Sequence, residues 1–194
     1  MKTLLKWTVR FVALLLVFPA ACLALFGRFQ SGFSFFSQAF ALVPGLPGSY
    51  LRVAWYSLTL QHSGLSNQIG LGSFFSHSRA AMGEGISIGA WCVMGQVSIG
   101  DRTQIACGVQ ILSGSQQHMR DAEGRLTDEG RVFRQIRVGT DCWLGAAAIV
   151  MADLGDGVTV ASACVVTKDV PLGAVVAGNP ARVLRSATDG IPLF

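Results

Sequence analysis

One histidine lies in the most polar stretch of an otherwise apolar chain, and its side chain is the first candidate for catalysis. The stretch is residues 113–135, SGSQQHMRDAEGRLTDEGRVFRQ, with His118 near its start. It holds eight charged residues, in a chain that has 15 basic and 11 acidic residues altogether. A lone loop histidine is more often an exposed residue without a role, but imidazole titrates near pH 6.5 and can take a proton from a hydroxyl. Because charged loops on rigid scaffolds commonly carry function, a site is sought here first.

The residues on either side of this loop repeat with a period of about six. Between residues 86 and 181 an aliphatic residue followed by a small one recurs, at the pairs that begin with Ile88, Met94, Ile99, Ile105, Ile111, Val138, Leu144, Val150, Val160, Val166 and Val176. Six is neither the 3.6 of a helix nor the 2 of a strand, so it indicates a short strand plus a turn. Three such units close one triangular coil, with the aliphatic side chain inside and the small residue at a corner. Coils of this kind bury their apolar faces only by stacking, so the pattern predicts an all-β array.

The composition agrees with one main domain plus an extension. The chain has 194 residues, of which 23 are glycine and 13% are charged, and both values suit a coil with many corners. The net charge is +4, and the aromatic residues gather in the N-terminal third rather than among clustered basic residues. Nucleic-acid binding is therefore not expected.

Five cysteines are spread along the chain, and none is paired as C-x-x-C. The last four fall beside the aliphatic positions of the repeat; the five are Cys22, Cys92, Cys107, Cys142 and Cys164. We expect small buried core residues in a reducing compartment, with no disulfide, metal or nucleophilic role.

The N-terminal region has a different character from the repeat. Lys2, Lys6 and Arg10 precede an uncharged apolar run over residues 11–26. Sixteen residues of helix reach about 24 Å, short of the roughly 30 Å hydrocarbon core of a bilayer. Pro19 is expected to kink such a helix. A secretory signal peptide is the obvious alternative, since it also has a basic start and an apolar stretch.

The residues after the apolar run argue against cleavage. Residues 29–60 stay apolar and aromatic, whereas signal peptides usually precede a polar mature start. We therefore expect residues 1–60 to form a retained, membrane-associated helical region, re-entrant or interfacial, with Trp7, Trp55 and Tyr56 as interfacial anchors. The alternative is that residues 29–60 are helices that cover the open end of the coil.

Three motifs in residues 139–185 resemble the C-terminal coils of the hexapeptide-repeat acyltransferases. They are Trp-Leu-Gly-Ala at 143–146, Val-Val-Thr-Lys-Asp-Val-Pro at 165–171 and Ala-Gly-Asn-Pro-Ala-Arg-Val at 177–183. The resemblance covers about residues 65–185 and is greatest to the polysaccharide, lipopolysaccharide and xenobiotic O-acetyltransferase branch. It implies a left-handed parallel β-helix over residues 61–185, followed by a short tail (186–194). It also implies a homotrimer with acetyl-coenzyme A in the groove between neighbouring subunits.

The resemblance assigns roles to particular residues. A histidine on a loop before the tryptophan-glycine corner is the general base in this family, which implies that role for His118. The chain departs from a common pattern, because Gln116 stands where a second histidine often lies. From the chemistry of the step, the backbone N–H groups near Gly145 and Ala146 are candidates to hold the oxyanion. The residues implied to bind the cofactor are Trp143, Gly145, Ser162, Thr167, Lys168, Arg182 and Arg185.

Other uses of the same scaffold remain as alternatives. A γ-type carbonic anhydrase needs three histidines converging on zinc, and His62, His77 and His118 are too scattered for that, so no metal is expected. A xenobiotic or serine O-acetyltransferase, or a non-catalytic β-helix assembly protein, stays possible. Asp141 and Asn179 are expected to stabilise turns rather than to contact substrate.

The expected membrane contact limits the acceptor. Acetyl-coenzyme A is cytosolic, so the coil is expected at the cytoplasmic face of the bacterial inner membrane. A simple span with the basic end inside would place the coil on the wrong side, whereas an interfacial or re-entrant region avoids this. The sequence therefore predicts O-acetylation of a cell-surface polysaccharide or its lipid-linked precursor.

Overall fold

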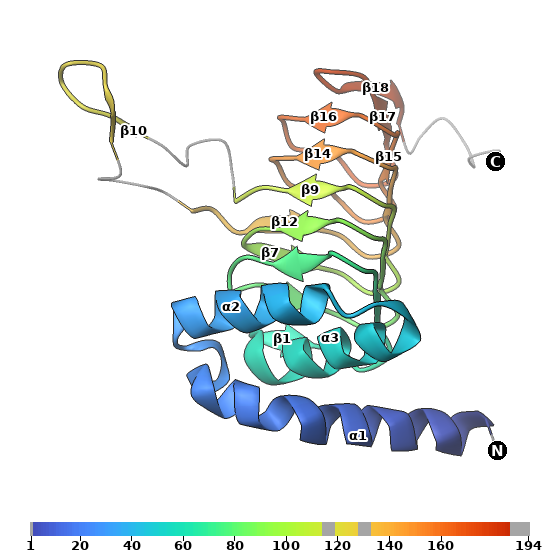
Figure 1. The fold of residues 1–194 in the computed structure, drawn as a ribbon. Helices are drawn as coiled ribbons and strands as arrows, with labels where there is room; N and C mark the ends of the chain where they lie inside the picture. The colour runs from blue at the N-terminus through green and yellow to red at the C-terminus, as the bar shows by residue number, and fades with distance from the viewer. Residues whose placement is uncertain (1, 114–118, 128–132, 187–194) are drawn as a thin grey trace.

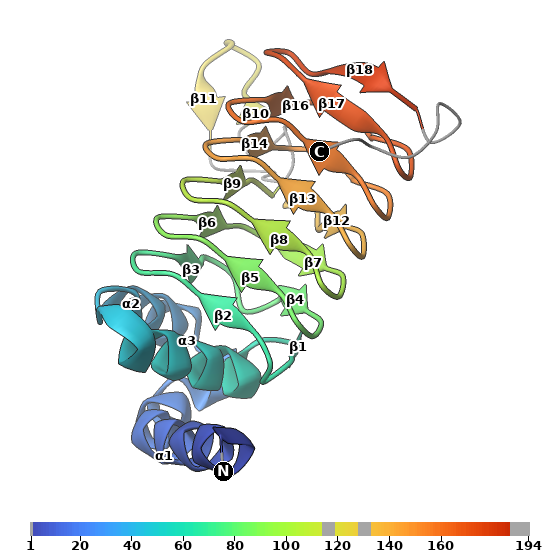
Figure 2. The ribbon, with the colours of Figure 1, turned by 90° about the vertical axis from the view of Figure 1, so that its right-hand side faces the viewer.

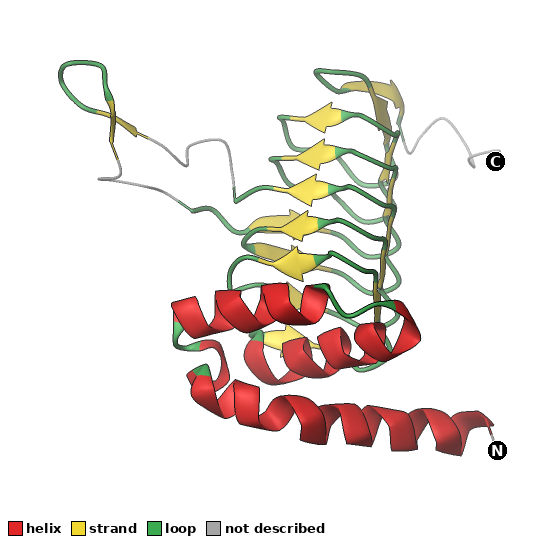
Figure 3. Cartoon of the chain, viewed as in Figure 1, coloured by secondary structure: helices red, strands yellow, loops and turns green. Residues whose placement is uncertain are grey.

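A parallel β-helix stands on three helices in this protein (Figure 1). The computed structural model describes residues 2–113, 119–127 and 133–186. The helical elements are α1 (Lys2–Leu23), the 3-10 turn η1 (Leu25–Gly27), α2 (Gln30–Ala41) and α3 (Gly45–Thr59). Figure 3 shows them gathered at one end of the stacked strands.

The strands stack into three faces, which we name A, B and C in the order the chain visits them (Figure 2). Face A holds β1 (His62–Ser63), β4 (Ala81–Met82), β7 (Val97–Ile99) and β12 (Ile136–Val138). Face B holds β2 (Gln68–Ile69), β5 (Ser87–Ile88), β8 (Gln104–Ile105), β13 (Trp143–Leu144), β15 (Thr159–Val160), β17 (Val175–Ala177) and β18 (Arg182–Arg185). Face C holds β3 (Phe74–Phe75), β6 (Val93–Met94), β9 (Gln110–Ile111), β14 (Ile149–Val150) and β16 (Val165–Val166).

The pairing within each face is parallel, except that β18 runs antiparallel to β17. Each strand therefore returns to its own face after one full coil, which confirms the stacked coils that the six-residue repeat predicts and the parallel β-helix that the resemblance implies. Leu154 and Val170 continue face A as single parallel bridges.

The aliphatic residues of the repeat form the inner column of the coil. Ile88 lies opposite Ile105, and Leu144 lies opposite Val160, each no more than 3% exposed. The column also extends toward the helices, to Ile69, Phe75 and Met82. Only every second residue of a strand is buried in this column, because successive side chains of a strand point to opposite faces.

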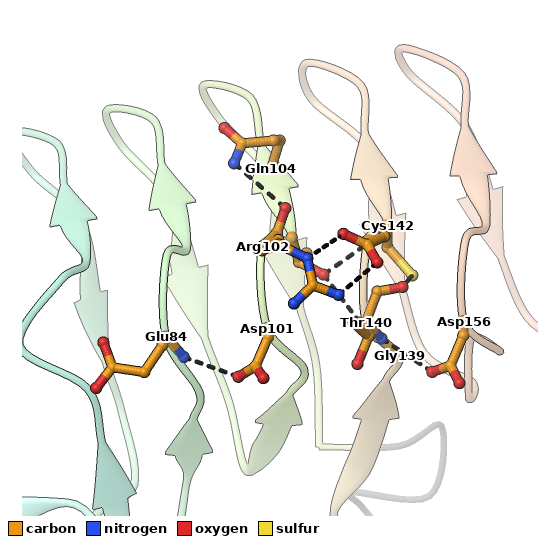
Figure 4. A network of polar contacts seen from close by, with 10 residues as sticks. Glu84, Asp101, Arg102, Gln104, Gly139, Thr140, Cys142 and Asp156 are labelled. Carbon is orange, nitrogen blue, oxygen red and sulfur yellow. Dashed lines mark hydrogen bonds and ion pairs between the residues drawn. The ribbon is translucent and has the colours of Figure 1, made fainter.

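Backbone stacks on backbone at the corners. A Cβ placed on Gly145 would lie 2.5 Å from the Ser162 nitrogen in the next coil, so only glycine fits there. At the corners between faces A and B, carboxylates accept backbone N–H bonds across coils (Figure 4). Asp101 accepts from Glu84 N–H at 2.9 Å, and Asp156 accepts from Thr140 N–H at 2.9 Å.

Asp141 stabilises a turn at these same corners. Its backbone has φ 55°, and its carboxylate accepts two hydrogen bonds from Arg102, each 2.7 Å long. Hydrogen bonding to Arg102 lowers the pKa of the Asp141 carboxyl. The pair is exposed, so it contributes little to the free energy of unfolding.

The cysteines only partly follow the prediction. Cys92, Cys142 and Cys164 are buried, and burial raises the pKa of each thiol. Cys22 and Cys107 are exposed, so the prediction of burial is wrong for those two. Cys107 falls on the corner after an inward residue rather than on the inward position itself. All five thiols are free.

Helices α2 and α3 cover the open end of the coil. Trp55 and Tyr56 are fully buried, so their assignment as interfacial anchors is wrong. The Trp55 indole N–H donates to the Ser37 hydroxyl at 2.9 Å, and Phe75 N–H in the first coil donates to the Tyr56 hydroxyl at 3.0 Å. Burial raises the pKa of Tyr56 to about 12. The alternative given for residues 29–60, a helical cover on the coil, is what the structure shows.

Arg52 joins three parts of this cover although its side chain is buried. Its guanidinium donates to the carbonyls of Phe40, Ala41 and Val43, at 3.0, 3.3 and 2.8 Å, where α2 ends. Its Nε–H donates to the Ile69 carbonyl of the first coil at 3.0 Å. Burial lowers the pKa of Arg52, and the four acceptors compensate for the lost hydration.

Helix α1 is longer than the apolar run predicted. It continues through Pro19 and spans 22 residues, which corresponds to about 33 Å. One described helix is long and apolar enough to cross a membrane, over Lys6–Leu23, judged by length and composition only. Its exposed large side chains include Phe11, Leu15 and Leu16, each at least 59% exposed.

Candidate active site

The loop that carries the predicted base leaves and rejoins the coil at one corner. It starts after Ile111 on face C and ends before Ile136 on face A. We call this the C–A corner. His118 lies outside the described residues, so its role remains a prediction.

Part of this loop has regular structure that the sequence did not predict. Strands β10 (Met119–Arg120) and β11 (Leu126–Thr127) form an antiparallel hairpin, which projects from the coil in Figure 1. Asp121 organises the turn, because its carboxylate accepts the N–H groups of Glu123 and Arg125 at 3.1 and 2.9 Å.

The returning end of the loop is attached to the scaffold. Arg134 N–H donates to the Ser113 carbonyl at 3.0 Å, and its side chain pairs with Asp153 at 2.5 Å. The Gln135 amide donates to the Arg79 carbonyl at 3.1 Å. Both ends of the loop are therefore held at the C–A corner of the middle coils.

The Trp-Leu-Gly-Ala motif lies at a different corner, between faces B and C. Trp143 points outward from β13 and is 45% exposed, while Leu144 points into the core. Gly145 N–H donates to the Val160 carbonyl at 2.8 Å, a bond that it would have to leave to serve an oxyanion. The N–H of Ala146 has no acceptor within the described part of the chain, and this residue is exposed. Ala146 is therefore the better placed of the two predicted donors.

The other residues predicted to bind the cofactor are distributed over three places. Ser162 lies directly above Gly145 at the B–C corner and is exposed. Thr167 and Lys168 are exposed at the C–A corner, between β16 and the Val170 bridge. Arg182 and Arg185 lie on β18, at the end of face B. The structure thus brings Trp143, Gly145 and Ser162 together at the B–C corner. The basic residues Lys168, Arg182 and Arg185 lie toward the C-terminal end of the coil.

One chain does not bring the loop and the B–C corner together. The loop projects from the C–A corner, while β15 and β17 of face B lie at the opposite edge of the molecule in Figure 1. A site that uses both needs the loop of one subunit and the B–C corner of another.

A cavity of about 980 Å³ lies between the helices and the first two coils, beside the returning end of the loop. It is lined by Phe26, Gly27, Arg28, Gln30, Thr59, Leu60, Gln61, His77, Ser78, Arg79, Gln96 and Phe133. The sequence does not predict this group, because its members are far apart in the chain, and His77 stands out there only as a possible zinc ligand. The one sequence signal was a histidine and an arginine two residues apart, in a coil that otherwise has few charges.

The described residues contain no group of three or more histidine, cysteine, aspartate or glutamate side chains that could hold a metal ion.

Comparisons with known proteins find acetyltransferases as the relatives to which the chain is similar. No family model matches the sequence. Nodulation protein L of Rhizobium meliloti is 39% identical over 116 residues, which are 52% of this chain and 60% of that protein. The chain spans at most 60% of the length of the curated relatives first matched.

Solved structures of the same architecture match most of the chain. A maltose O-acetyltransferase from Clostridium difficile 630 matches with TM-score 0.67 and 21% identity, over 81% of this chain and 88% of that one. A hexapeptide-repeat acetyltransferase from Vibrio cholerae, solved in complex with acetyl-coenzyme A, matches with TM-score 0.64 and 24% identity, over 82% and 89%. The repeat, the three motifs and the coil are those of hexapeptide-repeat acetyltransferases, which the chain resembles in sequence and in fold.

Proposed function

We propose that this protein is an acetyl-coenzyme A-dependent O-acetyltransferase that modifies a hydroxyl of a cell-surface polysaccharide or its lipid-linked precursor. The observation that carries the proposal is the B–C corner at Trp143–Ala146. There the exposed Trp143 indole lies next to Gly145 and Ala146, whose side chains are no larger than methyl, and the N–H of Ala146 is without an acceptor among the described residues. This is the kind of surface against which a thioester on a slender arm can lie.

The transfer itself is a direct displacement. The acceptor hydroxyl attacks the thioester carbonyl, its proton passes to the imidazole of His118, and the C–S bond breaks as the new C–O ester bond forms. The coenzyme leaves as a thiol after the proton is returned to its sulfur. General-base catalysis of this kind typically contributes about 10² to 10⁴ in rate.

The developing oxyanion needs a donor already in position. The N–H of Ala146 fits this role, because the Gly145 N–H is bonded to Val160 and thereby fixes the corner. A backbone donor held by the stacked coils requires little reorganisation during the reaction.

The coenzyme would follow the coil from this corner toward its C-terminal end. Ser162 continues the exposed corner by one coil. Lys168, Arg182 and Arg185 add positive charge at the same end, which suits the coenzyme phosphates. Thr167 offers a hydroxyl beside Lys168.

A homotrimer would complete the site. The loop and the B–C corner lie on opposite sides of one chain, so neighbouring copies would bring His118 of one subunit toward Ala146 of the next. The proposal therefore makes an isolated subunit inactive.

The acceptor class follows from the apolar region. The exposed apolar side chains of α1 support contact with the cytoplasmic face of a bacterial inner membrane. An acceptor whose lipid stays in the bilayer would then present its sugar to the coil.

The test uses the purified full-length protein with labelled acetyl-coenzyme A and lipid-linked glycans. We expect His118→Ala to lose about 10² to 10⁴ in transfer rate. The control His62→Ala changes an exposed histidine of the first coil and should keep full activity. Retention of most activity in His118→Ala, or a trapped acetyl-enzyme, would refute the mechanism. Transfer to serine or to an antibiotic, but to no glycan, would refute the acceptor and leave the mechanism intact.

A further inference from the structure

The cavity between the helices and the first coils has the properties of an anion site. Arg28 and Arg79 line it together with His77, and none of its lining residues within the described part of the chain is acidic. Neither arginine forms an ion pair with a described carboxylate. Two arginines and a histidine lining one open space favour an anion there, since charge-assisted bonds to phosphate oxygens are among the strongest in proteins.

Three glutamines line the cavity, and Gln61 and Gln96 add neutral amide groups beside the arginines. The amide of the third, Gln30, donates to the Ser76 carbonyl at 2.8 Å. That bond ties α2 to the first coil and so fixes one wall. Amides beside arginines are suited to an anion that carries further hydroxyl or ester oxygens.

The size of the cavity indicates a ligand larger than a free anion. A volume of about 980 Å³ is at the upper end of the range of about 300 to 1,000 Å³ for small-molecule sites. Inorganic phosphate would leave most of it filled with water. The space fits a phosphate together with the groups attached to it.

Exposed apolar side chains adjoin the cavity where α1 ends and η1 follows. Phe26 lines the cavity and is 47% exposed, and it continues a surface formed by Leu23 and Leu25, which are 70% and 60% exposed. The apolar side chains of α1 run on from there, so charge and apolar surface adjoin. This combination suits an amphiphile whose phosphate enters the cavity while its chains lie along α1.

The opposite wall belongs to the charged loop. The Phe133 ring lies 5.0 Å from the His77 ring, and the Gln135 amide donates to the Arg79 carbonyl. In Figure 1 the connection from α1 to α2 lies on the side from which the loop projects. A ligand in the cavity would therefore contact the returning end of the charged loop, near Phe133; His118 lies near the start of the same loop.

We propose that this cavity binds the phosphate head group of a membrane lipid, through Arg28 and Arg79, beside the apolar surface of α1. The inference uses the membrane placement in the proposed function but does not need the acetyl transfer. It assigns the helical region a ligand site in addition to its role as a cover for the coil.

The experiment measures binding of full-length protein to vesicles of phosphatidylcholine, with and without a minor fraction of phosphatidic acid. We expect the phosphatidic acid to raise the affinity about tenfold or more, since each arginine near an anionic surface contributes about 1 kcal/mol. Arg28→Gln combined with Arg79→Gln should remove this increase and keep the binding to phosphatidylcholine alone. The matched control Arg102→Gln removes an exposed arginine at the A–B corner and should keep the increase.

A second variant tests the cavity without changing charge. Gln61→Trp fills the space from an exposed position on its wall, and should also abolish the increase. An increase that survives in the double variant, or that is lost equally in Arg102→Gln, would overturn the proposal.

A soluble arm separates the two sources of phosphate. Pyrophosphate without vesicles should bind much more weakly than the vesicles with phosphatidic acid. Equally tight binding of pyrophosphate, lost in the double variant, would overturn the lipid source. Lipid binding without acetyl transfer would refute the proposed function alone, and transfer without the lipid effect would refute this inference alone.

Discussion

The coils and the helical cover bury their apolar side chains by different rules. In the coils each inward residue, such as Leu144, meets an equivalent residue one coil away, and the corners depend on backbone contact at positions such as Gly145. In the cover, individual buried polar groups connect helices to strands. Arg52 hydrogen-bonds both the end of α2 and the first coil, and the Tyr56 hydroxyl accepts a hydrogen bond from Phe75 N–H. The coils can therefore be read from a local pattern, whereas the cover depends on contacts that no local pattern shows.

The largest effect is expected from removing the guanidinium of Arg52. Arg52→Met removes four hydrogen bonds to buried or half-buried carbonyls, and hydrogen bonds to a charged group contribute about 1.5–3 kcal/mol each. The carbonyls of Phe40 and Ala41 keep a backbone N–H donor, which limits the loss. We expect the free energy of unfolding to fall by about 3 kcal/mol, measured by chemical denaturation. Arg28→Met, which changes an exposed arginine near the start of α2, should alter it by no more than about 0.5 kcal/mol. Equal losses in the two variants would contradict the role given to Arg52.

A substitution at a coil corner tests the other rule. Gly145→Ala places a methyl group 2.5 Å from the Ser162 nitrogen, and backbone there cannot move without shifting the next coil. Overpacking of this kind costs about 1–3 kcal/mol. Ala146→Ser, one residue further along the same corner but exposed, should leave the unfolding free energy nearly unchanged. A tolerated alanine at residue 145 would show that the coils adjust at their corners.

Tyr56→Phe tests the joint between cover and coil with little change in volume. The variant leaves the buried Phe75 N–H without its acceptor, which costs about 1–2 kcal/mol. Tyr50→Phe is a matched control, because Tyr50 is only half-buried. Amide exchange at Phe75 should quicken in Tyr56→Phe and not in Tyr50→Phe. Unchanged exchange in both would mean that the hydroxyl does not hold the first coil.

The predictable part of the fold is the part governed by repetition. The repeat predicts each inward position from Ile88 to Val176 individually, because a six-residue period fixes which residue of every unit points into the coil. The burial of Trp55 was not predictable, since an aromatic helix facing a membrane and one facing a coil have the same composition. The site divides in the same way. The corner at Trp143 was found through its motif, whereas His77 and Phe133 meet only because residues 56 apart in the chain fold against one cavity.

The smallest expected effect is a dependence of stability on pH that is caused by His77, which lies between the helical cover and the first coils. Burial, and then the charge of Arg79, lower the pKa of His77 from its usual value of 6.5. The unfolded chain therefore binds this proton more readily than the folded one, so the stabilising contribution is complete above pH 6.5 and is lost as the pH falls below it. His77 is partly exposed, so solvent screening keeps the change within about 0.5 kcal/mol. In His77→Gln the decline in thermal midpoint between about pH 6.5 and 5 should become smaller, whereas in His62→Gln the decline should be the same as in the parent protein. If instead the stability of the parent protein rises as the pH falls through this window, His77 gains a proton on folding, and the cavity already holds an anion.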